Sequence, residues 1–157
     1  MHLSSRTDIE APIDFVYAAL TDFEGWERAA MRRGAEVTRT DKLRAIGIGM
    51  SWKVRFQFQG KERVVDIRLL GLEPDAKLSF TGKGKLLEGD LSIELLSLSP
   101  KRTRIVVHLA VRPLTLGARL LLQSAKLARA RLQSRFNKRL RQLSTDIEQR
   151  FVASRKR

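Results

Sequence analysis

The sequence contains no cysteine, no long apolar run and few aromatic residues. Without cysteine, disulfide bonds, thiolate zinc sites and cysteine nucleophiles are excluded, and the composition fits a reducing compartment. No stretch approaches the ~20 apolar residues that a membrane-spanning helix needs, and the N-terminal residues show no apolar run of signal-peptide length. We therefore expect a soluble protein located in the cytoplasm.

Acidic residues are scarce toward the C-terminus. Most of the net charge of +14 is in residues 114–157, which hold 12 Lys and Arg against 2 Asp and Glu, whereas residues 1–113 hold 19 against 15. Such a surface attracts phosphate groups, whether they belong to nucleic acid or to anionic lipid. The 157 residues suit one domain, and no linker or repeat divides them, so we predict a single domain over 1–157.

Apolar and polar residues alternate through the middle of the chain, as they do in strands with one buried face. In residues 51–59 this places Trp52, Val54, Phe56 and Phe58 on one side and charged or polar residues on the other. Turn residues such as Gln59-Gly60 separate the segments. The pattern predicts a curved antiparallel sheet with strands over 3–9, 35–40, 51–59, 61–72, 77–82, 86–98 and 102–111.

Two short helices are predicted after the first strand. Pro12 and Asp14 suit a helix start, and Gly34 suits the end of a second helix over 21–33. From Leu114 onward, apolar residues recur every three or four positions and predict one unusually long helix that covers the sheet. Its apolar stripe is Leu114, Ala118, Leu121, Ala125, Ala128, Leu132, Phe136, Leu140, Leu143, Ile147 and Phe151.

The other side of the predicted long helix changes character along its length. Its first part carries Leu116, Leu120 and Leu127, and a helix that is apolar on two sides needs a second partner. We expect intramolecular packing, a membrane surface or a homodimer through these leucines. Its second part carries the candidate surface for an anionic partner: Arg129, Arg131, Arg135, Lys138, Arg139 and Arg141. An anionic membrane, RNA and a merely solvated face all remain open for this surface.

The order of these elements, together with the segment Ile9-Glu10-Ala11-Pro12 to Phe23 and the turn Gly71 to Pro74, resembles the START-like superfamily, also called SRPBCC. Within it, the chain is similar to bacterial proteins of the polyketide cyclase/dehydrase and lipid-transfer type. The resemblance covers about the whole chain. It implies an α+β helix-grip fold, in which a curved antiparallel sheet of about six to seven strands wraps around a long C-terminal helix. It carries over no catalytic residue and implies no cofactor.

The resemblance also implies an interior that binds an apolar molecule such as a lipid, an isoprenoid, a quinone or a polyketide. Strand alternation then gives the side chains that face this interior, with two residues of the second short helix near its entrance. Each of them is first of all a candidate core residue. The candidate ligand-binding residues are Trp26, Met31, Trp52, Val54, Phe56, Phe58, Ile67, Leu69, Phe80, Ile93, Leu95, Val107, Leu109 and Leu121.

The sequence contains little that indicates a catalytic or metal-binding site. The two histidines are His2, near the N-terminus, and His108, which strand alternation turns outward. Asp66 and Glu94 also fall on outward positions, and no histidine or carboxylate spacing fits a metal site. We expect no metal and a protein that is more a binder than an enzyme. Three functions remain open: carrying a hydrophobic ligand, binding RNA or ribosomes through the basic helix, and acting as a polyketide cyclase or aromatase.

Overall fold

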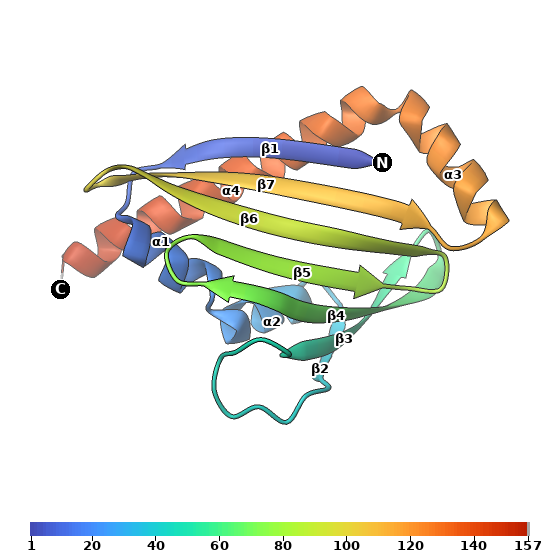
Figure 1. The fold of residues 1–157 in the computed structure, drawn as a ribbon, viewed down its shortest axis with the longest axis horizontal. Coiled ribbons are helices and arrows are strands. Elements are labelled where there is room, and N and C mark those ends of the chain that lie inside the picture. Colours follow the sequence, from blue (N-terminus) through green and yellow to red (C-terminus); the bar gives the residue numbers. More distant parts are fainter. Residues whose placement is uncertain (157) are drawn as a thin grey trace.

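The computed structural model describes residues 1–156, and over these residues the chain forms one seven-stranded antiparallel sheet with helices on one face (Figure 1). The strands lie in the order β1-β7-β6-β5-β4-β3-β2. Their bounds are β1 His2–Ile9, β2 Glu36–Arg39, β3 Ser51–Phe58, β4 Lys61–Glu73, β5 Lys77–Lys83, β6 Leu87–Ser99 and β7 Arg102–Pro113. The helices are α1 Ile13–Leu20, α2 Phe23–Arg32, α3 Leu116–Leu127 and α4 Arg129–Arg155.

Strands β3 to β7 form a meander of consecutive hairpins. The β3–β4 turn consists of Gln59 and Gly60 alone, and both have positive φ angles of 54° and 75°. Two residues of positive φ make the tight turn whose twist matches that of antiparallel strands. The predicted meander is therefore confirmed, and β1 completes the sheet by pairing with β7 rather than with β2.

Side-chain alternation divides the sheet into an outer face and an inner face, which is turned toward α1, α2 and α4. Strand β4 departs from strict alternation because a bulge lies between Leu69 and Gly71. Leu69 pairs with Phe80 and Leu72 pairs with Leu78, so both leucines face inward although three positions separate them. The extra residue, Leu70, is turned outward and is half exposed. A bulge inserts one unpaired residue and shifts the alternation beyond it by one.

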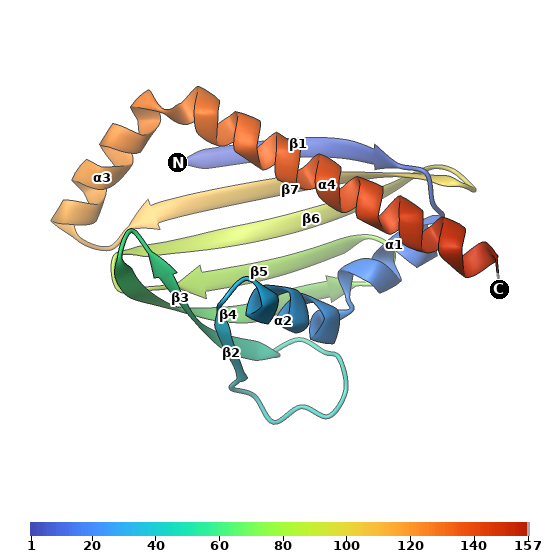
Figure 2. The same ribbon diagram turned by 180° about the vertical axis from the view of Figure 1, so that it is seen from behind.

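The C-terminal helical region is bent rather than continuous. The predicted single helix from Leu114 is wrong in its first part, because Ala128 adopts φ −102° and ψ 17° and separates α3 from α4. Helix α4 runs across the inner face beside β1, whereas α3 stands at the end of the sheet, against the last residues of β7 (Figure 2). The predicted stripe is buried or partly buried on α4 from Leu132 to Phe151, but Leu121 on α3 is half exposed.

Hydrogen bonds from α4 side chains to β1 hold the helix beside this strand. Gln133 Nε2 donates to Ser4 O at 2.7 Å, and Ser144 Oγ donates to Asp8 O at 2.9 Å. Arg129 adds a longer contact of 3.3 Å from its guanidinium to His2 O. Polar residues on the buried side of α4 therefore bind main-chain carbonyl groups of β1 along its whole length.

Candidate functional site

The inner face of the sheet is buried at one end and exposed at the other. On β7, Ile105 is 0% and Val107 6% exposed, whereas Leu109 and Val111, farther along the strand, are only partly buried. Strand β6 runs the opposite way and shows the reverse order, from partly buried Leu91 to buried Leu95. On β3, exposure rises from 6% at Trp52 to 57% at Phe58. The exposed end is the one at which α3 lies (Figure 2).

The buried end, which we call the packed half, is closed by three helices. Its strand residues pack with Val16 and Leu20 of α1, Phe23 of α2, and Leu140 and Ile147 of α4. At its border, the Phe23 ring lies 5.3 Å from the Trp52 ring and 6.2 Å from the Phe80 ring. The packed half consists of Ile9, Trp52, Leu69, Leu78, Leu95, Ile105 and Val107. These residues form the hydrophobic core.

The other end, which we call the open half, presents partly buried apolar side chains of five neighbouring strands. Its residues are Val54, Phe56, Arg63, Val65, Ile67, Phe80, Leu91, Ile93, Leu109 and Val111. Gly82 and Gly89 pair directly within it and place no side chain on the inner face. A Cβ built at Gly82 would contact Val65 Cγ1 at 3.5 Å, an ordinary van der Waals distance, and would meet no other side chain or neighbouring strand within 4 Å.

Arg63 is the single charged member of the open half. It pairs with Phe56 across β3 and β4 and shares the inward parity of Val65 and Ile67. Its Nε atom is buried and has no hydrogen-bond partner within the described residues. A buried donor without a partner costs free energy, so this position favours an acceptor brought from outside the chain.

The structure separates the predicted ligand-binding residues into three groups. Trp52, Leu69, Leu95 and Val107 lie in the packed half and are buried. Val54, Phe56, Ile67, Phe80, Ile93 and Leu109 come together in the open half. Trp26, Met31, Phe58 and Leu121 are 44–57% exposed, on α2, at the β3–β4 turn and on α3. Sequence reasoning missed Arg63, Gly82 and Gly89, although their strand parity was available as a signal.

A polar cluster borders the site beside Trp52. Glu27 Oε1 accepts a 2.9 Å hydrogen bond from Trp52 Nε1, and the Arg39 guanidinium lies 5.7 Å from the Trp52 ring. Arg39 binds the Asp41 carboxylate, which also accepts from the amides of Ser51 and Leu43. Arg39, followed by these amides, holds the pKa of Asp41 well below its usual range. The cluster fixes the loop 41–50 against the sheet.

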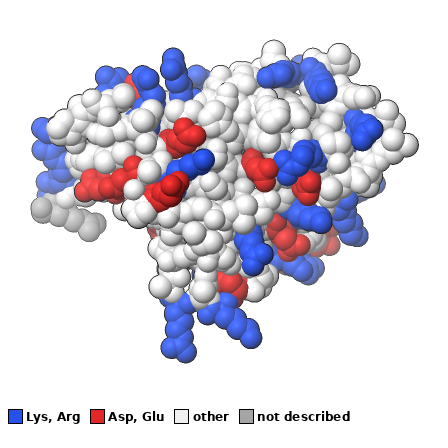
Figure 3. All heavy atoms as spheres, in the orientation of Figure 1, with Lys and Arg blue, Asp and Glu red and all other residues white. Residues whose placement is uncertain are grey.

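The predicted anionic-partner residues are all exposed, but only five of them lie on the side of α4 opposite its buried stripe. The sixth, Arg129, is turned toward β1 and contacts His2 O. On the outer face of the sheet, by contrast, two arginines form close ion pairs: Arg104 binds Asp8 at 2.8 Å and Arg112 binds Asp90 at 2.8 Å, and each arginine lowers the pKa of its partner carboxyl. Figure 3 shows adjoining red and blue side chains on the face of the sheet that is turned toward the viewer. No ion pair within residues 1–156 involves Arg129, Arg131, Arg135, Lys138, Arg139 or Arg141.

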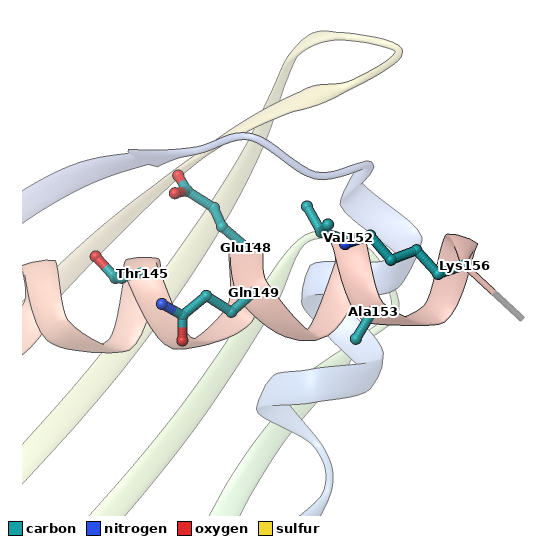
Figure 4. Close-up of a pocket in the computed structure, with 6 residues that line it drawn as sticks. All are labelled: Thr145, Glu148, Gln149, Val152, Ala153 and Lys156. Carbon is teal, nitrogen blue, oxygen red and sulfur yellow. The ribbon is translucent and has the colours of Figure 1, made fainter.

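Surface hollows also occur away from the inner face. One of about 470 Å³ is lined by residues of α4 and the residue after it: Thr145, Glu148, Gln149, Val152, Ala153 and Lys156 (Figure 4). Because one helical segment supplies all of these side chains, this hollow is a shallow surface depression. Another of about 590 Å³ crosses the outer face, where Ser4, His108, Ser92 and Ser79 form one row over four strands. The side chains of that row face away from the open half.

Within residues 1–156, no group of three or more histidine, aspartate or glutamate residues is placed to hold a metal ion. The same residues contain no helix with the length and hydropathy needed to cross a bilayer. His108 lies on the outer face, exposed, as its parity predicts. The residues of the open half offer apolar contact together with one guanidinium group.

No protein-family model and no curated protein matches the sequence. Solved structures match its fold over nearly the whole chain. The Zhui aromatase/cyclase of Streptomyces sp. R1128 superposes with a TM-score of 0.69 at 15% identity, covering 96% of this chain and 94% of that one. A protein from Thermus thermophilus gives 0.65 at 18% identity, with coverages of 98% and 99%.

A START superfamily protein from Mycobacterium smegmatis gives a TM-score of 0.58 at 13% identity, covering 85% of this chain and 95% of that one. The chain has the START-like helix-grip fold. The predicted α+β fold class is thereby confirmed, with seven strands and α4 as the long helix that the sheet grips. At these identities the likeness concerns the helix-grip fold alone.

Proposed function

We propose that the protein binds a hydrophobic small molecule, without transforming it, on the open half of the inner face. One observation carries this proposal: inward-facing apolar side chains lose their cover progressively toward α3, on β3, β6 and β7 alike. Exposed apolar surface of this kind is typical of ligand sites, which are concave and mostly apolar. An occupant would bury side chains that the chain itself leaves partly exposed.

The chemistry of the open half favours binding over catalysis. General acid–base catalysis needs a titratable group near the reacting atoms, and the residues of the open half include no histidine, aspartate or glutamate. A polyketide cyclase similar to the Streptomyces aromatase/cyclase is the alternative that the fold suggests. Arg63 alone offers such an enzyme only electrostatic stabilisation of a developing anion.

Arg63 narrows the class of ligand. A guanidinium group binds carboxylate or phosphate through two parallel hydrogen bonds, and its planar fork suits both groups. An apolar molecule with such an anionic end, lying on the open half with that end at Arg63, would supply the acceptor that Nε lacks. Among lipid-, isoprenoid-, quinone- and polyketide-like molecules, the acidic ones are therefore favoured.

The experiment compares oleic acid with oleyl alcohol, which share one hydrocarbon chain, and measures both by native mass spectrometry and calorimetry. We expect both to bind and the acid to bind more tightly. Gly82→Leu fills the space above Gly82 and should abolish binding of both molecules, whereas Gly47→Leu, in the loop 41–50, should bind them normally. Binding of neither molecule by a folded wild-type sample would refute the proposal. Binding of both with equal affinity would refute only the role of Arg63.

A further inference from the structure

Helix α3 exposes leucine side chains that nothing in the described chain covers. Leu116, Leu120 and Leu127 are 75%, 61% and 92% exposed. At 3.6 residues per turn the three positions fall within an arc of about 40°, so they form one row along the helix. The opposite side of α3 packs inward, with Ala118 2% exposed. Three leucines in a row on the outward side are far more apolar surface than folding requires of this helix.

Basic side chains flank this row and acidic ones are missing. Arg119 and Lys126 lie on one flank of the leucines, and Arg129 begins α4 directly after α3. From residue 95 to residue 145 the sequence contains no Asp or Glu. Neither Arg119 nor Lys126 takes part in an ion pair within residues 1–156. In Figure 3, the upper right, where α3 lies, shows blue side chains among white ones.

We propose that α3 docks the protein onto an anionic lipid bilayer, with the Leu116, Leu120 and Leu127 row inserted at the headgroup level. A helix that lies at a membrane surface needs an apolar face, which enters the boundary between headgroups and acyl chains. It also needs basic side chains beside that face to bind lipid phosphates, and α3 has both. The flexible stems of Arg119 and Lys126 allow their charges to reach the headgroups while the leucines are buried.

Other occupants fit the same residues less well. In a homodimer through the leucine row, the Arg119 and Lys126 flanks of two copies would lie close together, and no carboxylate on α3 would compensate their repulsion. RNA would be attracted by the basic side chains, because recognition of its phosphate backbone is electrostatic. A row of leucines adds nothing to that attraction. Only a bilayer uses the apolar and the basic residues together.

The position of α3 connects this surface with the ligand site. Helix α3 contacts β7 at the end of the sheet where the open half lies (Figure 2). If the proposed function is correct, a protein docked through α3 would hold the open half next to the bilayer, from which an acidic amphiphile can be taken. Docking itself does not depend on that ligand, so the two proposals can fail separately.

The test is flotation with vesicles of phosphatidylcholine alone or of equal parts phosphatidylcholine and phosphatidylglycerol. We expect binding only to the vesicles with phosphatidylglycerol, and weaker binding at higher salt. The triple variant Leu116→Gln/Leu120→Gln/Leu127→Gln should bind them about tenfold or more weakly. The matched control is Leu96→Gln/Leu98→Gln, which removes leucines of the outer face that are 52% and 42% exposed, and it should bind normally.

Three outcomes would overturn the proposal. Equal binding by the triple variant and the wild type would show that the leucine row is not inserted. Wild-type dimers that the triple variant cannot form, found by sedimentation without lipid, would assign the row to self-association. The protein could also bind RNA instead of the vesicles, with an affinity that depends on salt and is the same in the triple variant. That result would assign the basic side chains to nucleic-acid binding. Circular dichroism of each variant checks that it is folded.

Discussion

The two halves of the inner face are built from the same strands and the same kinds of residue, yet they differ in what covers them. Leu91 and Leu95 lie on one face of β6, four residues apart, but Leu95 is 5% exposed whereas Leu91 is only partly buried. The packed half is covered by α1, α2 and α4. The open half lacks such a cover because α3 turns away from the sheet at Ala128. The composition of the strands therefore does not distinguish a hydrophobic core from a ligand site. The two halves differ only in whether helices cover them.

The largest expected difference between the halves is in stability. Leu95→Ala should lower the free energy of unfolding by about 2–5 kcal/mol, because it leaves a cavity among buried side chains. Leu91→Ala should lower it by about 1 kcal/mol, because water already reaches part of that side chain. Urea denaturation followed by circular dichroism measures both values. Equal losses would show that the two halves are packed alike.

A smaller difference is expected between the two ends of the contact between α4 and β1. Ser144→Ala removes a partly buried hydrogen bond to Asp8 O and should cost about 1–2 kcal/mol of unfolding free energy. Gln133→Ala removes the hydrogen bond to Ser4 O near the open half and should cost less than about 1 kcal/mol, since water can replace it. Thermal and urea unfolding of both variants test the order. If Gln133→Ala lost more unfolding free energy than Ser144→Ala, the end of the α4–β1 contact beside the open half would contribute more to stability, contrary to this prediction.

Replacing Arg63 should separate stability from binding. Arg63→Met removes a buried donor that has no partner, so the free energy of unfolding should stay unchanged or rise by up to about 1 kcal/mol. The preference for oleic acid over oleyl alcohol should disappear in this variant. Arg68→Met, on the outer face of the same strand, is the control and should keep that preference. A clear loss of stability in Arg63→Met would reveal a structural role that contradicts the proposed one.

The smallest effect concerns the loop at the border of the two halves, and it depends on pH. Because the pKa of Asp41 is lowered in the folded protein, its ionised form stabilises the fold above its unfolded pKa of about 4. This contribution is lost progressively as the pH falls below about 4 toward the folded value. Asp41→Asn should therefore be slightly less stable than the wild type at neutral pH, and the difference should shrink in acid. A difference that is constant with pH would contradict this assignment.

Much of the fold could be predicted because strand alternation has a period of two and α4 has a regular apolar stripe. For that reason alternation predicts the face of Phe56 and Leu109, two apolar residues of the open half, correctly. The bulge at Leu70 could not be predicted, because it depends on how β4 pairs with β5. Arg63 could have been found from its parity with Val65 and Ile67, but alternation was weakest in this strand.

The bend at Ala128 was missed for a different reason. Alanine favours helices, so nothing local in the sequence marks the end of α3. The polar residues Gln133 and Ser144 were also assigned no role, because their partners are carbonyl groups of β1, more than 120 residues away in the sequence. Such contacts follow from the position of α4 in space, which the pattern of apolar residues does not specify.

The contact between α4 and β1 has a further consequence for how the protein behaves when crowded. β1 is one of the two edge strands of the sheet, and an edge strand with free carbonyl groups can pair with another chain and start aggregation. The carbonyls of His2, Ser4 and Asp8 already accept hydrogen bonds from α4. The other edge is β2, which spans only Glu36–Arg39. The carbonyl groups at one edge are thus already hydrogen-bonded, and the strand at the other edge is short. Both features disfavour pairing of this sheet with the sheet of another molecule.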